Sequence, residues 1–112
     1  MRLLKQRLQN KELTIGSWIT IGNSTIAEIL ANAEYDWLVV DLEHTTISLE
    51  QAGELIRTIE LSGVSSLVRL TSNNEDQIKR VMDAGAQGIV VPMVKSVEDA
   101  RLAVAATRYP PL

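Results

Sequence analysis

Several absences in the sequence limit what the protein can be. It has no cysteine, which excludes a disulfide framework and a thiolate metal site and suits a reducing compartment. The net charge of -3 offers no basic surplus for nucleic acid. No apolar run reaches the length of a membrane helix, and Arg2, Lys5 and Arg7 interrupt the leucines where a signal peptide would be apolar. We therefore expect a cytoplasmic protein with neither nucleic-acid nor membrane partners.

The residues that are present have the balance of a globular domain. Of the 112 residues, 46% are hydrophobic and 22% are charged, which predicts that residues 1–112 form one domain, or part of one, with a substantial core. Leu3, Leu4 and Leu8 recur at helical spacing within residues 1–10. This pattern predicts a short amphipathic helix that lies against an apolar surface and could cap one end of a barrel.

Apolar runs then alternate with capped helical segments along the rest of the chain. Ser48 with Gln51, and Asn74 with Gln77, show the spacing at which a side chain caps a helix start. The alternation predicts four successive strand–helix units. The expected strands lie near residues 14–19, 37–41, 66–70 and 88–91, and the expected helices cover residues 25–33, 49–61, 74–85 and 96–109.

Four such units predict a parallel sheet, because each strand must return through a crossover connection. Two closures remain open. An open doubly wound sheet usually has a glycine-rich phosphate turn after its first strand, whereas residues 20–23 contain one glycine, Gly22. The alternative is half of an eight-stranded barrel, which would have two open strand edges and would need a partner to cover them.

Polar side chains follow the expected strands where the strands end. Trp18 ends the first, Asp41, Glu43 and His44 follow the second, and Arg69 closes the third. The carboxyl ends of parallel strands meet at one edge, so we expect these residues on one rim. An arginine there can bind a carboxylate or phosphate, and a histidine can transfer a proton. Anion binding beside a base is the chemistry that this pattern favours.

Each of these residues also has a structural interpretation. The single histidine of the chain could be a structural side chain, and Arg69 could belong to a structural salt bridge. Direct metal ligation by Asp41, Glu43 and His44 is disfavoured, because a strand end would aim the three side chains inconsistently. Asp83 falls late in a helix, where the helix dipole disfavours a carboxylate and Lys79 is a neighbour four residues away.

An ordered set of motifs runs along the chain from about Gly16 to Pro111. Its residues are Gly16 to Trp18, Ala27 to Ala31, Asp36 to His44, Val68 and Arg69, Asp83 to Pro92, and Arg108 to Pro111. In this order the motifs resemble the amino-terminal half of the class II pyruvate aldolases of the HpcH/HpaI family, which includes 4-hydroxy-2-oxoheptanedioate aldolase and 2-dehydro-3-deoxyglucarate aldolase.

The resemblance implies a fold and a chemistry. The fold would be a (β/α)8 TIM barrel, of which this chain supplies the first four β/α units as a half barrel with a short N-terminal helix. A divalent metal, Mg or Mn, would hold the keto acid and stabilise the pyruvate enolate. By resemblance, His44 is the proton-transfer residue, Arg69 contacts the pyruvate and the developing charge, and Asp83 pairs with the histidine. A helix end just before the fourth strand lies at the opposite end of the barrel from His44, so the topology predicts that this pairing crosses a subunit boundary. Arg69 and Trp18 are the expected substrate-binding residues, with Asp41 and Glu43 as support.

The chain departs from the family at its end. In the family the metal-binding glutamate and aspartate lie after the fourth unit, so their counterparts are expected beyond Leu112, and no metal ligand is assigned within this chain. It could be a fragment of a longer enzyme, a natural truncation or a half barrel that pairs with another. We favour a truncated or partial aldolase chain that is inactive alone. Its expected partners are a small keto acid, an aldehyde and further copies of itself in a homo-oligomer. The alternative is a non-catalytic self-associating half-barrel module.

Overall fold

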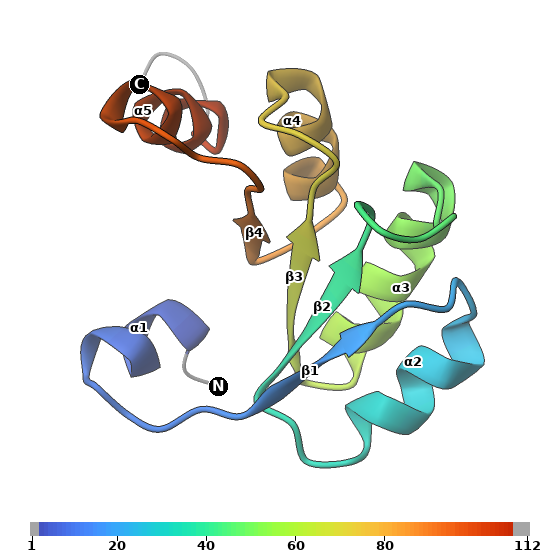
Figure 1. Ribbon diagram of the computed structural model, residues 1–112. Coiled ribbons are helices and arrows are strands. Elements are labelled where there is room, and N and C mark those ends of the chain that lie inside the picture. The colour runs from blue at the N-terminus through green and yellow to red at the C-terminus, as the bar shows by residue number, and fades with distance from the viewer. Residues whose placement is uncertain (1–2, 109–112) are drawn as a thin grey trace.

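The computed structural model describes residues 3–108, which form a single parallel sheet with helices around it (Figure 1). Helices and strands alternate along the chain, as the sequence pattern predicted. The elements are α1 (Leu4–Gln9), β1 (Gly16–Ile19), α2 (Ser24–Ala31), β2 (Trp37–Asp41), α3 (Leu49–Leu61), β3 (Ser65–Arg69), α4 (Glu75–Asp83), β4 (Gly88–Val90) and α5 (Val97–Ala106). No helix among these residues is long and apolar enough to cross a bilayer.

The four strands are arranged in their order along the chain, β1-β2-β3-β4, and every pairing is parallel. The prediction of four parallel strands is therefore confirmed. A doubly wound sheet requires a reversal of strand order, and the sheet formed by residues 3–108 has none. Each crossover contains a helix, which is the usual way to return a chain to a parallel neighbour.

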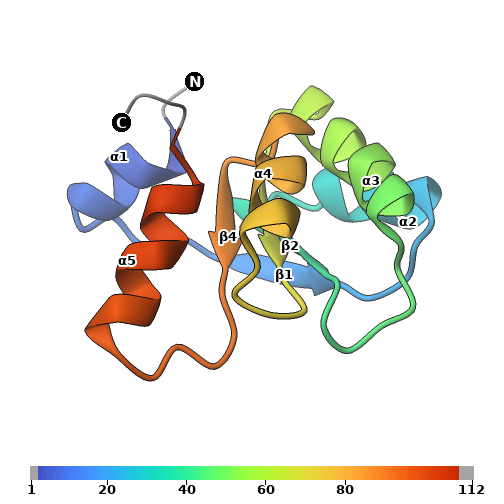
Figure 2. The same cartoon turned by 90° about the horizontal axis from the view of Figure 1, so that it is seen from above.

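One face of the sheet is covered by helices and forms the core. Figure 2 shows α2, α3 and α4 grouped together, with α5 beyond β4. Leu38, Val40 and Val68 of the central strands are fully buried there. The helices begin where their caps predict, since the Ser48 hydroxyl accepts a hydrogen bond from the Gln51 backbone N–H and the Asn74 side chain accepts one from the Gln77 N–H. This packing fixes the strand ends in space.

The opposite face carries the alternate residues of each strand. We refer to it as the inner face. The strand register pairs Trp18 with Val39 and Leu67 with Gly88, so these residues share that face. Trp18 is 40% exposed. Val39 is buried, but it does not belong to the core cluster under the helices. The inner face is therefore only partly covered.

The short helix α1 covers the amino-terminal end of the inner face and is tied to it by a charged pair. The Arg7 guanidinium donates a 2.6 Å hydrogen bond to Asp36, and the other Asp36 oxygen accepts the Ile15 backbone N–H at 2.7 Å. These two bonds hold the pKa of Asp36 below its usual value. Leu4 is buried at the contact, whereas Leu3 and Leu8 are each more than half exposed, so only part of the predicted apolar side of this helix lies against the sheet.

The observed boundaries differ slightly from the predicted ones. β1 starts at Gly16 rather than residue 14, because the Ile15 backbone groups bond to the Asp36 side chain and backbone. β3 begins and ends one residue earlier than predicted, and β4 ends at Val90, where Leu70 donates its N–H to the Val90 carbonyl. Met1, in the predicted first helix, and Tyr109, at the predicted end of the last, lie outside the described residues.

Candidate functional site

The candidate site lies at the carboxyl ends of β1, β2 and β3. The register places Asp41 opposite Arg69, the last residues of β2 and β3. The backbone ladder continues one step further, because Leu42 donates its N–H to the Arg69 carbonyl at 2.9 Å. Both side chains therefore project from a hydrogen-bonded frame, as expected for a rim of functional residues on a parallel sheet.

Asp41 holds the Arg69 guanidinium through two hydrogen bonds. Arg69 Nε donates to Asp41 Oδ1 at 3.0 Å, and Nη2 donates to Oδ2 at 2.8 Å. The Asp41 side chain is 3% exposed, whereas that of Arg69 is 26% exposed. The bonds from Arg69 outweigh the effect of burial and lower the pKa of Asp41 to about 2. The structural salt bridge that was the alternative interpretation of Arg69 is present, and it orients the guanidinium.

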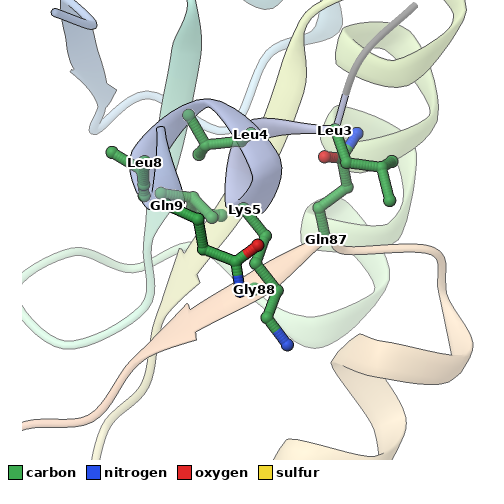
Figure 3. A pocket seen from close by; sticks show the side chains of 8 residues that line it. Leu3, Leu4, Lys5, Leu8, Gln9, Gln87 and Gly88 are labelled. Atoms are coloured by element: carbon green, nitrogen blue, oxygen red, sulfur yellow. The ribbon is translucent and has the colours of Figure 1, made fainter. Parts of the chain in front are cut away.

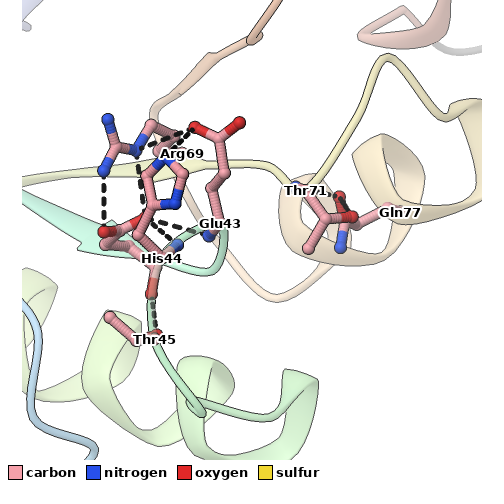
Figure 4. A network of polar contacts seen from close by, with 7 residues as sticks. Glu43, His44, Thr45, Arg69, Thr71 and Gln77 are labelled. Atoms are coloured by element: carbon pink, nitrogen blue, oxygen red, sulfur yellow. Dashed lines mark hydrogen bonds and ion pairs between the residues drawn. The ribbon is translucent and has the colours of Figure 1, made fainter.

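Asp41 also shapes the loop that carries Glu43 and His44. Its Oδ1 accepts the backbone N–H of Glu43 at 2.9 Å and that of His44 at 3.3 Å. The Thr45 hydroxyl donates a short hydrogen bond to the Asp41 backbone carbonyl (Figure 4). One buried carboxylate thus fixes both the arginine and the turn beside it.

Glu43 lies between the arginine and the histidine. Its Oε1 is 3.5 Å from Arg69 Nε and 3.3 Å from His44 Nε2 (Figure 4). The His44 side chain is 70% exposed, so its imidazole is open to a ligand or a proton donor. The rim therefore carries one cluster, made of Glu43 and His44, which follow β2, and Arg69, which ends β3. The strand-end pattern predicted this grouping.

Trp18 completes the cluster from β1. The Arg69 guanidinium carbon lies 4.5 Å from the centre of the Trp18 ring, within the range of a cation–π contact. The strand-end pattern predicts Trp18 on this rim, but it predicts neither the stacking nor the Thr45 hydrogen bond. Both depend on side-chain direction. The only available signals were the strand end at Trp18 and a hydroxyl four residues after Asp41.

Asp83 lies near the amino-terminal ends of the strands, opposite the rim that carries His44. It ends α4, and residues 84–87 connect it to the amino-terminal end of β4. His44 follows the carboxyl end of β2, and the strands are parallel. The two residues therefore do not meet within one chain, as the topology predicted. The Nζ atom of Lys79, the predicted neighbour of Asp83, lies 3.3 Å from Oε1 of Glu75.

The rim does not by itself fit a divalent metal. Among residues 3–108, no three His, Cys, Asp or Glu side chains are grouped so as to hold an ion. Both Asp41 carboxylate oxygens already accept hydrogen bonds from Arg69, and Oδ1 also accepts two backbone N–H groups. A ligand set for Mg²⁺ requires several oxygens that are free to face the ion. The described residues of this chain do not supply such a set.

The remaining chemical capacity of the rim is anion binding next to an exposed imidazole. The contacts with Asp41 and Glu43 use Arg69 Nε and Nη2. Nη1 has no hydrogen bond or ion pair within the part of the chain that the structure describes, so it can donate to a ligand. A guanidinium that is already oriented loses little conformational freedom on binding a carboxylate or an enolate oxygen.

Comparisons with known proteins agree with this geometry. Residues 14–112 match the model of the HpcH/HpaI aldolase/citrate lyase family. The 4-hydroxy-2-oxo-heptane-1,7-dioate aldolase of Salmonella dublin is 40% identical over 96% of this chain and 41% of its own length. The 2-dehydro-3,6-dideoxy-6-sulfogluconate aldolase of Pseudomonas putida is 34% identical over 94% of this chain, again 41% of its own length.

A solved structure supports the same relationship. The crystal structure of an HpcH/HpaI aldolase from Desulfitobacterium hafniense DCB-2 superposes with a TM-score of 0.89 and 32% identity, over 100% of this chain and 44% of that one. The chain thus spans less than half the length of the relatives that it matches, which is consistent with part of a barrel. The rim, the parallel sheet and these matches lead to one conclusion: the chain belongs to the HpcH/HpaI aldolase/citrate lyase family.

Proposed function

We propose that this chain is the amino-terminal half barrel of a class II aldolase that cleaves 4-hydroxy-2-keto acids to pyruvate and an aldehyde. One observation carries the proposal: a buried carboxylate, Asp41, holds Arg69 bidentately on the carboxyl rim of a parallel sheet, beside the exposed His44. Relatives named as aldolases support it, since they share this portion of the chain.

Arg69 binds the keto acid in this proposal. Cleavage breaks the bond between C3 and C4, and the bonding electrons move into the keto group to give the pyruvate enolate. Negative charge therefore grows on the keto oxygen, which Nη1 of Arg69 binds in this proposal, and a fixed donor stabilises such charge without reorganising. Trp18 stacks on the guanidinium and forms a wall of the same subsite.

His44 moves the proton. The C4 hydroxyl must lose its proton as the aldehyde forms, and an exposed imidazole next to the substrate anion is suited to accept it. Glu43 contacts the same imidazole at 3.3 Å. In this proposal Asp83 of a neighbouring subunit pairs with His44, because within one chain the two residues lie at opposite ends of the parallel strands.

The divalent metal implied by the family would be held by residues outside this chain. The described residues provide no ligand set for it, so the roles of Arg69 and His44 are argued without it. We accordingly propose that residues 1–112 act within a longer cytoplasmic polypeptide or a homo-oligomer, and that the chain alone is inactive.

A second candidate function is a non-catalytic self-associating module. The partly exposed inner face favours it, since Trp18 is 40% exposed on a strand that forms one edge of the sheet. Under this alternative the residues of the rim would stabilise the fold only. Activity after completion of the barrel distinguishes the two candidates.

The test joins this chain to the carboxyl-terminal part of the Salmonella dublin aldolase, in place of the matching part of that enzyme. We expect the fusion to release pyruvate from a 4-hydroxy-2-keto acid when Mg²⁺ or Mn²⁺ is supplied, and the 112-residue chain to release none. The matched control is the fusion carrying Arg69→Met, which retains the side-chain length without the charge. A folded fusion with no cleavage, or with the same cleavage as its Arg69→Met variant, would refute the proposal.

A further inference from the structure

An apolar cleft lies beside α1, away from the rim (Figure 3). Its volume is about 710 Å³, and its lining includes Leu67 of β3 and Gly88 at the start of β4. Among the described residues that line it there is no carboxylate, hydroxyl or imidazole. The groups that can assist a reaction are gathered instead at the rim, where the turn between β2 and α3 carries His44.

His44 depends on its backbone for its position. Its side chain is 70% exposed, and among residues 3–108 the one polar contact of its imidazole is with Glu43, at 3.3 Å from Nε2 to Oε1. An ion pair at an exposed side chain contributes little, and such a side chain samples several rotamers. The turn must therefore set the direction in which the imidazole leaves the backbone.

The Thr45 hydroxyl joins the two ends of this turn. It donates a hydrogen bond to the backbone carbonyl of Asp41, the last residue of β2, and it accepts one from the Ile47 N–H at 3.1 Å. Ile47 is buried in the core under the helices. One end of the turn is thereby fixed to the sheet and the other to the core, with Glu43 and His44 between them.

We propose that Thr45 is a positioning residue for the reaction at the rim, and that its hydroxyl holds the turn in the shape that directs His44 toward the substrate bound by Arg69. A hydroxyl has one hydrogen to donate, and Thr45 donates it to the Asp41 carbonyl. Thr45 therefore acts through His44 and not on the substrate. This role rests on the proposed function, because it requires that His44 moves a proton of the keto acid.

Thr45 and Asp41 hold the turn in different ways. The Asp41 carboxylate binds Arg69 as well as two backbone N–H groups of the turn, so its loss would disturb anion binding and the turn together. Thr45 binds the Asp41 carbonyl and leaves the carboxylate to Arg69. Loss of the Thr45 hydroxyl should therefore impair proton transfer while the keto acid still binds.

Thr45→Val in the fusion with the Salmonella dublin aldolase tests this role, since valine keeps the branched shape and lacks the hydroxyl. We expect kcat to fall about 10- to 100-fold, while KM for the keto acid changes by less than about twofold. Thr45→Ser retains the hydroxyl and should keep kcat within about threefold of the parent fusion. In a His44→Ala fusion, Thr45→Val should lower the residual kcat no further, because its effect passes through the imidazole.

The matched control is Thr46→Val, the same substitution one position later. Thr46 is exposed, and its hydroxyl has no hydrogen bond within the part of the chain that the structure describes. Its substitution should leave kcat unchanged. Equal losses of kcat from Thr45→Val and Thr46→Val, an equal loss from Thr45→Ser, or a rise in KM that accounts for the whole effect would overturn the proposal.

Amide hydrogen exchange of the 112-residue chain gives a readout that does not need activity. The backbone N–H groups of Glu43 and His44 bind Asp41, and that of Ile47 binds Thr45. Thr45→Val should raise the exchange rates of these three amides about tenfold, and Thr46→Val should raise them by less than about twofold.

The two measurements separate the failure of this role from the failure of the proposed function. Unchanged exchange in the turn, or faster exchange that extends through the buried strands β2 and β3, would overturn the positioning role. So would a parent fusion that cleaves the keto acid and a Thr45→Val fusion that cleaves it equally well. A folded parent fusion that does not cleave would refute the proposed function itself, and with it any catalytic role for Thr45.

Discussion

The two faces of the central strands differ in what they contribute. On the helix-covered face, Leu38, Val40 and Val68 are fully buried against α2, α3 and α4. On the inner face of the same strands, Asp41 and Arg69 form an ion pair. One face therefore stabilises the chain through apolar packing, and the other presents oriented polar groups on the rim.

The difference follows from the two-residue period of a strand. Val40 and Asp41 are adjacent in sequence but point to opposite sides of the sheet. The backbone hydrogen bonds that position the valine in the core also position the aspartate on the rim. Substitutions on the two faces should consequently separate stability from activity, and the following predictions test that separation.

The largest effect is expected from His44→Ala in the fusion with the Salmonella dublin aldolase. Loss of the proposed proton acceptor should lower kcat for cleavage by roughly two to four decades, with pyruvate binding nearly unchanged. Since His44 is 70% exposed, the free energy of unfolding should change by about 0.5 kcal/mol or less. Steady-state kinetics and urea unfolding of the same protein check both parts. A large loss of stability with a normal kcat would show that His44 stabilises the fold and does not take part in cleavage.

Leu38 and Leu67 offer a matched pair on neighbouring strands. Leu38→Ala removes a fully buried side chain from the helix-covered core and should lower the free energy of unfolding of the 112-residue chain by about 3 kcal/mol. Leu67 is only partly buried on the inner face, so Leu67→Ala should cost about 1 kcal/mol in the monomer. Urea unfolding at concentrations where light scattering shows a monomer measures both. Equal costs would show that the inner face is a second core.

Asp41 should make stability depend on acid. Its pKa is lowered to about 2 from an ordinary value of 3.8, so its contribution is complete above the ordinary value and is lost as the pH falls through the folded value. The difference in unfolding free energy between the wild-type chain and Asp41→Asn should shrink by about 2 kcal/mol from about pH 5 to about pH 2. Denaturant unfolding across this range measures it. A constant difference would show that the ion pair does not contribute.

The smallest effect is expected at Trp18. Trp18→Leu keeps an apolar side chain on an exposed strand but removes the aromatic face above Arg69. The free energy of unfolding should change by about 0.5 kcal/mol or less. In the fusion, KM for the keto acid should rise about two- to fivefold while kcat is nearly retained, because the guanidinium loses one of its orienting contacts. An unchanged KM would exclude Trp18 from the substrate subsite.

Much of the fold could be predicted because its signals are local. Four apolar runs, the caps at Ser48 and Asn74, and the single glycine of the first turn were enough to predict parallel strands and to disfavour a nucleotide-binding sheet. The site could be predicted in part, because polar residues at strand ends must share a rim in a parallel sheet. The strand ends alone therefore predict that Asp41, Glu43, His44 and Arg69 lie together.

Other features could not be predicted, because they depend on side-chain geometry between distant elements. The hydrogen bond from Arg7 to Asp36 joins residues 29 positions apart in the sequence. The three acceptor roles of Glu60, toward the Ser66 backbone and hydroxyl and the Gln87 amide, likewise have no sequence signal. The boundaries of β1 shifted for the same reason, since a side-chain carboxylate replaced a strand partner at Ile15.

A crystal structure of the fusion with pyruvate bound tests the central claim most directly, namely that Asp41 orients Arg69 to bind the keto acid. We expect Arg69 to retain both hydrogen bonds to Asp41 and to place Nη1 within about 3 Å of a pyruvate oxygen. His44 should face the side from which the aldehyde leaves. Pyruvate bound in the cleft beside α1, or at the rim with Arg69 turned away and still fully paired, would contradict the claim.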